Sequence, residues 1–199
     1  MIKSRRSMRL KDHDYTQGGY YYFITICTQN RAEQFGRVEN DNMVLNQSGK
    51  VVREEWVLSE EIRQEIELDE FIIMPNHLHG IIMMKHLKAK EANENPVTNP
   101  VRAHGRAPQQ SCRPQQRWRN PKSLGSFIAG FKSITTKRIN ELRKSPRKSL
   151  WQANYYDHII RTEISLHQIR QYILDNPINW PNDPDNNQLE ANYASLSRL

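Results

Sequence analysis

Cysteine is scarce in this 199-residue sequence, which has two, and apolar residues make up only 37% of it. Cys27 and Cys112 lie far apart and form no metal-type pair, so a reduced, cytoplasmic setting is expected. No apolar run approaches the roughly 20 residues of a membrane span. The basic start of the chain lacks the apolar core of a signal peptide. We therefore expect one domain of ordinary size, with or without appendages, and no membrane partner.

Acidic residues are also in the minority, since 22 Asp and Glu stand against 29 Lys and Arg for a net charge of +7. A basic chain favours an anionic partner, and nucleic acid is the commonest one. The alternative is that the excess charge serves solubility alone.

Strands and helices alternate in the residue pattern. Aromatic and β-branched residues predict a first strand, and the Pro75-Asn76 break divides a later apolar run into two strands. Apolar residues at helical spacing predict helices, the first capped by Asn46 or Ser48. This order predicts an α+β sandwich whose helices pack on one face of an antiparallel sheet. The expected strands cover residues 20–28, 68–74, 77–85 and 155–160, and the expected helices cover residues 46–65, 123–144 and 165–175.

Four further segments complete the expected organisation. Residues 30–46 connect the first strand and helix, with a hairpin around residues 40–42 as one interpretation, and Pro177 should end the last helix. Residues 1–18 form a basic lead-in, residues 19–180 a single domain, and residues 181–199 a weakly structured tail. Residues 88–121 are rich in Pro, Arg and Asn and cannot bury an apolar face, so we expect a mobile insertion. Its basic cluster contacts nucleic acid or is a solvated linker: Arg113, Arg117, Trp118 and Arg119.

A His-x-His motif follows the Pro75-Asn76 break. In an extended strand, residues two apart point to the same face, so His77 and His79 project together while Leu78 points away. Two imidazoles side by side can share one divalent cation. The alternative is a pair of surface histidines on a half-buried strand.

Tyr172 and Asn176 lie four residues apart in the last expected helix and therefore share a face. Singly, a helical Tyr is usually a core residue, and an Asn before Pro usually marks a helix end. Together with His77 and His79, however, Asn176 supplies an amide oxygen to a Mg²⁺ or Mn²⁺ ion with open positions for a phosphate oxygen. Tyr172 could then attack the phosphorus covalently, leaving a phosphotyrosine and a free 3′-hydroxyl.

Taken together, these motifs resemble the single-tyrosine HUH transposases, and more closely the REP-associated tyrosine transposases. The resemblance covers about residues 15–180 and includes Pro75–His79, Trp151, the run Tyr156–Arg161, Tyr172-Ile173 and Asn176-Pro177. It implies an RRM-like, or ferredoxin-like, core that binds single-stranded DNA with a hairpin. It also implies that His77, His79 and Asn176 occupy the metal-ligand positions and Tyr172 the nucleophile position. Some relatives have Gln as third ligand; the shorter Asn requires the helix to lie closer to the strand.

For other residues near these motifs, the sequence leaves two roles open. Tyr155, Tyr156 and His158 are alternative nucleophiles or ligands, although Tyr156 is better explained by packing. Arg161 either pairs with Asp157 or reaches a phosphate. Basic residues on the helix before it are expected to contact the hairpin backbone, unless they only line a solvated face. These expected DNA contacts are Lys132, Lys137, Arg138 and Arg161.

The leading hypothesis is therefore a metal-dependent, single-stranded DNA endonuclease and strand transferase that cuts near hairpin palindromes through a 5′-phosphotyrosine. The alternative is a domesticated protein that binds hairpin DNA without productive transposition. A replication-initiator nickase fits less well, because no helicase domain is present, and RNA binding is formally open. A homodimer and a monomer are both compatible with the sequence.

Overall fold

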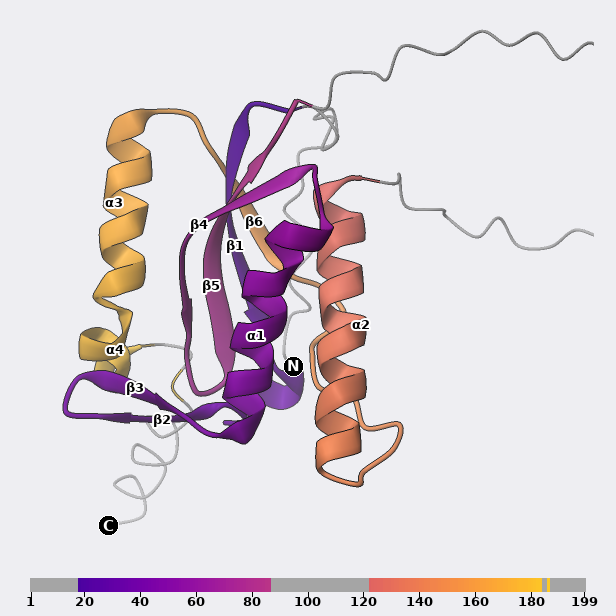
Figure 1. The fold of residues 1–199 in the computed structure, drawn as a ribbon. Coiled ribbons are helices and arrows are strands. Elements are labelled where there is room, and N and C mark those ends of the chain that lie inside the picture. Colours follow the sequence, from indigo (N-terminus) through magenta and orange to yellow (C-terminus); the bar gives the residue numbers. More distant parts are fainter. Residues whose placement is uncertain (1–17, 87–121, 184–185, 187–199) are drawn as a thin grey trace, which may run out of the picture.

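The main sheet has four antiparallel strands in the order β4–β5–β1–β6 (Figure 1). The structure, a computed structural model, describes residues 18–86, 122–183 and 186. The expected α+β, ferredoxin-like class is confirmed. The strands are β1 (Tyr20–Cys27), β2 (Gly36–Glu39), β3 (Asn42–Leu45), β4 (Ile66–Ile73), β5 (His77–Met84) and β6 (Tyr156–Ile160). The helices are α1 (Gln47–Ile62), α2 (Leu124–Leu142), α3 (Glu163–Leu174) and α4 (Asn176–Asn179), with 3₁₀ turns η1 (Gln29–Arg31) and η2 (Trp180–Asn182).

Short polar side chains begin the three long helices. The Asn46 side chain accepts hydrogen bonds from the backbone of Ser48 and Gly49, which settles the choice between Asn46 and Ser48 as the cap of α1. Ser123 caps α2 in a reciprocal arrangement with Ser126, and Thr162 caps α3. The hairpin is also confirmed, because β2 and β3 pair around residues 40–41, both of which have a positive φ.

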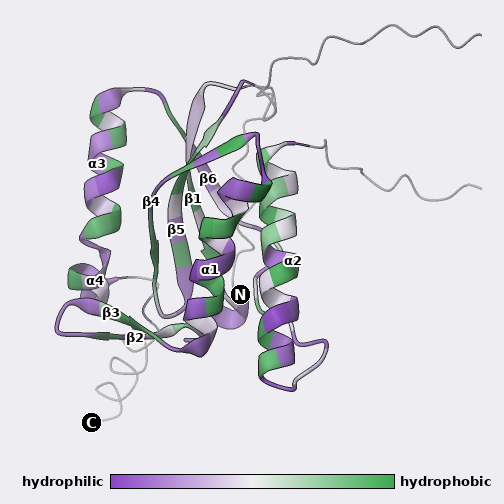
Figure 2. Cartoon of the chain, in the orientation of Figure 1, coloured by the Kyte–Doolittle hydropathy of each residue, from purple (hydrophilic) through white to green (hydrophobic). Residues whose placement is uncertain are grey.

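Helices cover both faces of the main sheet, so the expectation that they pack on one face is wrong. Helices α1 and α2 lie on one side and α3 on the other (Figure 1). Apolar side chains of β5 point alternately into the two cores, Leu78 and Ile82 towards α1 and α2, and Ile81 towards α3. Every β5 residue except Met83 is buried, as expected for a strand covered on both faces. The hydropathy colouring agrees, since the long helices carry both hydrophobic and hydrophilic stripes (Figure 2).

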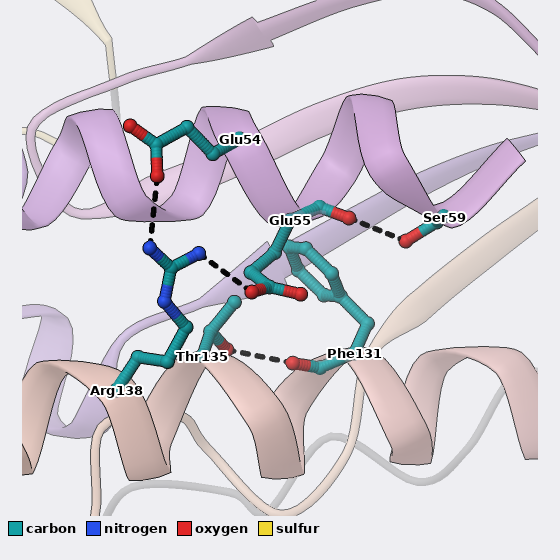
Figure 3. Close-up of polar contacts among 6 residues, drawn as sticks. All are labelled: Glu54, Glu55, Ser59, Phe131, Thr135 and Arg138. Carbon is teal, nitrogen blue, oxygen red and sulfur yellow. Dashed lines mark hydrogen bonds and ion pairs between the residues drawn. The ribbon is translucent and has the colours of Figure 1, made fainter. Parts of the chain in front are cut away.

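An ion pair joins α1 to α2 on the outer side of the larger core (Figure 3). Arg138 donates to Glu55 at 2.6 Å and to Glu54 at 2.9 Å. Arg138 was predicted to contact DNA, but its guanidinium is already paired with two carboxylates of the protein. Beneath it, Thr135 receives a hydrogen bond from the buried indole of Trp151 and donates to the carbonyl of Phe131.

The last long helix ends close to the expected residue 175, but Pro177 lies inside the next helix and does not end it. Helix α3 ends at Leu174, and Pro177 lies in the first turn of the short helix α4. Proline is well tolerated there because the first turn needs no backbone N–H donor. The predicted helix stop at Pro177 is therefore a helix start.

Parts of the predicted organisation fall outside the described residues. These are residues 1–17 of the lead-in, all of the insertion at 88–121 with its cluster Arg113–Arg119, and most of the tail. Within the described residues, no helix is long and apolar enough to cross a membrane.

Gly80 tests the packing of the larger core. Its position faces the buried Trp56, and an added Cβ would lie 2.7 Å from that ring. Gly80→Ala should therefore lower the free energy of unfolding by about 1–3 kcal/mol through overpacking. Gly130→Ala is the control, because an added Cβ in α2 meets nothing within 4 Å, and it should raise stability by about 0.5–1 kcal/mol through helix propensity. If urea denaturation gave the same change in the free energy of unfolding for both variants, the contact between Trp56 and β5 would be contradicted.

Candidate functional site

His77 and His79 lie side by side on the α3 face of β5. Both are buried, with 0% and 5% of their surface exposed, and their ring centroids are 4.4 Å apart. The strand register places Cys27 of β1 beside His77 and Thr25 beside His79. The alternative of two surface histidines is therefore wrong.

Each imidazole is oriented by a hydrogen bond at Nδ1. His77 Nδ1 lies 2.8 Å from Asn76 Oδ1, and His79 Nδ1 lies 2.9 Å from the Thr25 hydroxyl. An amide oxygen only accepts, so Nδ1 of His77 carries the proton and its Nε2 keeps a lone pair. This is how metal-binding histidines are usually held, with one ring nitrogen fixed and the other directed at the ion.

Asn176 and Tyr172 complete the predicted set from the junction of α3 and α4. Asn176 is 1% exposed, and its Oδ1, like Nε2 of His77, is a buried atom without a hydrogen bond of ordinary geometry. The two side chains are nevertheless close enough to interact, and this interaction partly offsets the lowering of the His77 pKa. The Tyr172 hydroxyl lies 3.4 Å from Nε2 of His79. The four residues thus meet within one chain, a question that the sequence left open.

The donor set fits a hard divalent cation. Two imidazole nitrogens and an amide oxygen would leave positions for water and a phosphate oxygen. Among residues 18–86, 122–183 and 186, no three His, Cys, Asp or Glu side chains cluster, so the predicted set stands out by its two imidazoles and one amide. Buried polar atoms without partners are costly, and a bound ion would satisfy both His77 Nε2 and Asn176 Oδ1.

Burial keeps both histidines neutral. It lowers the pKa of His79 to about 3 and that of His77 well below its usual value, where His79 and Arg31 add a smaller repulsion. Neutral imidazoles are the form that binds a metal. The pair is therefore ready to accept a cation at neutral pH.

The environment of Tyr172 makes its phenol less acidic. Burial raises the pKa of Tyr172, and the Asp183 carboxylate raises it further, while Asn176 opposes both effects. The side chain is still 46% exposed and so remains accessible from solvent. A nucleophilic Tyr172 therefore needs a nearby positive charge to promote loss of its proton.

Several residues at the site were missed by the sequence reasoning. Trp180 of η2 lies against His77, with ring centroids 5.9 Å apart, and Arg31 of η1 influences both His77 and Asp183. Asn76 was part of the motif, but its role in orienting His77 was not inferred. No local pattern identifies Arg31, Asp183 or Trp180, because only the folded chain brings them to the histidines.

Three of the four residues predicted to contact DNA lie on α2. Helix α2 is on the sheet face opposite the histidines, so Lys132, Lys137 and Arg138 cannot touch a phosphate bound there. The Lys132 ammonium donates to the carbonyls of Gln152 and Asn154, and Lys137 is exposed.

The remaining candidates separate in the same way. Arg161 is exposed just after β6. Tyr155 packs against the α2 core beneath Lys132, which argues against it as the nucleophile, whereas Tyr156 lies on the histidine face.

Comparison with known proteins places this geometry in context. No protein-family model matches the chain. An uncharacterized protein of Haemophilus influenzae is 39% identical over 184 residues, spanning 92% of this chain and 93% of that protein. The solved structure of a REP-associated tyrosine transposase bound to a REP hairpin aligns over 86% of this chain and 74% of that one, with a TM-score of 0.51 and 16% identity. An identity of 16% shows that the two proteins share a fold. The resemblance to this family that the motifs indicated is therefore confirmed for the fold.

Acid should destabilise the metal-free protein through its buried histidines. A histidine has a pKa near 6.5 when unfolded, above the folded pKa of about 3 for His79. The unfolded state therefore binds more protons as the pH falls below about 6.5, and stability is lost from there downward. Between pH 7 and 5.5, each buried histidine should lower the free energy of unfolding by about 1 kcal/mol. The measurement is urea denaturation in the presence of chelator.

His167, an exposed histidine on α3, supplies the matched control for this measurement. His79→Gln should remove about half of the pH dependence, because His77 contributes the rest, whereas His167→Gln should leave it unchanged. A slope that survives His79→Gln in full would show that His79 is not the titrating group.

Proposed function

The chain belongs to the family of the Haemophilus influenzae protein, and we propose that it is a transposase-type enzyme that nicks and joins single-stranded DNA. The observation that carries the proposal is the meeting of two buried, neutral imidazoles, an unpartnered amide oxygen and a solvent-accessible tyrosine. The shared fold with a transposase bound to a DNA hairpin supports DNA as the substrate. We infer hairpin-bearing single strands as its partner and the cytoplasm as its location.

His77 Nε2, His79 Nε2 and Asn176 Oδ1 would hold the divalent cation, Mg²⁺ or Mn²⁺. When bound, it would polarise the scissile phosphate and offset the charge that develops there. The Tyr172 hydroxyl lies 3.4 Å from Nε2 of His79, one of the three atoms that would hold the ion.

Tyr172 is proposed to attack the phosphorus. A bond forms between its phenolic oxygen and phosphorus as the bond to the 3′-oxygen breaks, and the proton lost by the phenol is balanced by one gained at the 3′-oxygen. The products are a 5′-phosphotyrosine and a free 3′-hydroxyl. The phosphodiester linkage is conserved in the covalent intermediate, so a second 3′-hydroxyl can reverse the reaction and join a new strand.

The cis arrangement makes a second copy unnecessary for this chemistry. Tyr172 reaches His79 of its own chain at 3.4 Å, so one chain contains the whole proposed set. Whether two copies associate on DNA is a separate property, and a homodimer is compatible with the same geometry.

Tyr172→Phe should abolish covalent attachment but leave hairpin binding within a few-fold. The full chain would be incubated with a library of labelled single-stranded DNA hairpins, in Mn²⁺ or in chelator, and adducts that survive SDS would be counted. Tyr155→Phe is the matched control, because that ring packs on the other face of the sheet, and it should keep the adduct. His77→Ala should lose cleavage with the cation.

Three outcomes would redirect the proposal. An adduct that persists in Tyr172→Phe would make another tyrosine the nucleophile. Tight hairpin binding with no adduct in any metal would favour the alternative, a hairpin-binding protein without transposition, which the raised Tyr172 pKa also supports. Equal binding of matched RNA hairpins would argue against a DNA-specific role.

A further inference from the structure

Aromatic side chains on β6 continue the histidine face of the sheet. In the strand register, Tyr156 lies opposite Thr25, which lies opposite His79. His158 lies opposite Phe23 in the next row. Directly paired residues share a face, so Tyr156 and His158 are on the same side of the sheet as the histidines.

This part of the face remains open to solvent. Helix α3 lies over β4 and β5, where Ile81, Leu166 and Ile173 form a small core. On the edge strand β6, by contrast, Tyr156 is 37% exposed and His158 is also exposed. Packing against Phe23, which the sequence favoured as the role of Tyr156, therefore covers only part of the ring.

Ring contacts link this open edge directly to the proposed metal ligand. Phe23 stacks on His79 with centroids 5.2 Å apart and planes 28° apart. Tyr156 and Tyr172 each meet the Phe23 ring edge-on, at 6.4 Å and 6.0 Å. A group bound on Tyr156 would thus be one ring removed from both the nucleophile and the histidines.

An unpaired nucleobase is the occupant that this surface fits best. Exposed aromatic rings on a sheet are the usual platform for single-stranded nucleic acid, since each base offers a π-face to stack on. The face is aromatic and polar, with a phenol and an imidazole, and the chain carries a net charge of +7. An aliphatic surface of a protein partner would not be complementary to this polar face, whereas a single strand offers both bases for the rings and phosphates for the basic chain.

We propose that Tyr156, with His158 and Phe23, forms a stacking platform that holds an unpaired nucleotide of the strand that carries the scissile phosphate. The proposal rests on the proposed function and extends it to the single-stranded flank of the hairpin. Stacking tolerates any base, so the platform positions the strand for Tyr172 and does not select a sequence.

Tyr156→Leu removes the π-face, whereas Tyr156→Phe retains it. The probes are random-stem DNA hairpins with and without single-stranded poly-dT flanks, measured in chelator so that no cleavage occurs. Tyr156→Leu should weaken binding of the flanked hairpins by about 5- to 100-fold and leave the blunt ones unchanged. Tyr156→Phe should bind both like the unchanged protein.

Tyr20→Leu is the matched control, because Tyr20 is also 37% exposed but pairs with Met84 on the opposite face. It should bind both kinds of hairpin normally. A second readout places 2-aminopurine at successive flank positions: its fluorescence should be quenched at one position by the unchanged protein and not by Tyr156→Leu.

Each remaining outcome is decisive. If the unchanged protein forms the metal-dependent adduct but Tyr156→Leu binds flanked hairpins normally, the platform is wrong and the proposed function stands. An equal loss for blunt and flanked hairpins would likewise overturn the platform, because the ring would then support the fold or the hairpin contact. If the unchanged protein binds no hairpin and forms no adduct, the proposed function fails and the platform with it.

Discussion

The burial of two adjacent imidazoles in one strand is the constraint on which the rest of the structure depends. Removing these rings from water costs free energy. The cost is smaller because both rings are neutral. Each Nδ1 also has a hydrogen-bond partner, Asn76 for His77 and Thr25 for His79. Their Nε2 atoms are then left directed at α3 and α4. The same arrangement that makes burial tolerable therefore leaves free the two nitrogen atoms that the proposed cation would bind.

Coverage of the sheet on both faces brings the second half of the site to the histidines. Helices α1 and α2 close the larger core around Trp56, which leaves the opposite face to α3. Helix α3 covers β4 and β5 only in part, so Tyr172 lies beside His79 at a border between packed and open sheet. A nucleophile at such a border can approach a buried ion and an exposed strand of DNA at once.

Local patterns predicted the strands, the cap of the first helix as Asn46 or Ser48, and the shared face of His77 and His79, because alternation and capping depend on neighbours in sequence. The spacing of Tyr172 and Asn176 predicted their shared face for the same reason. Long-range relations were beyond such patterns: the placement of α3 on the second face, the ion pair of Arg138 with α1, and the exposure of Tyr156. The near-continuous apolar run of β5 was the available signal for two-sided coverage.

Covalent chemistry at Tyr172 is the central claim, and mapping the attachment site tests it most directly. The SDS-stable complex would be digested with nuclease and protease, and the nucleotide-bearing peptide would be sequenced by mass spectrometry. The account predicts a phosphodiester-linked nucleotide on Tyr172. A nucleotide on Tyr155 or Tyr156, or attachment to any residue away from the histidines, would contradict it.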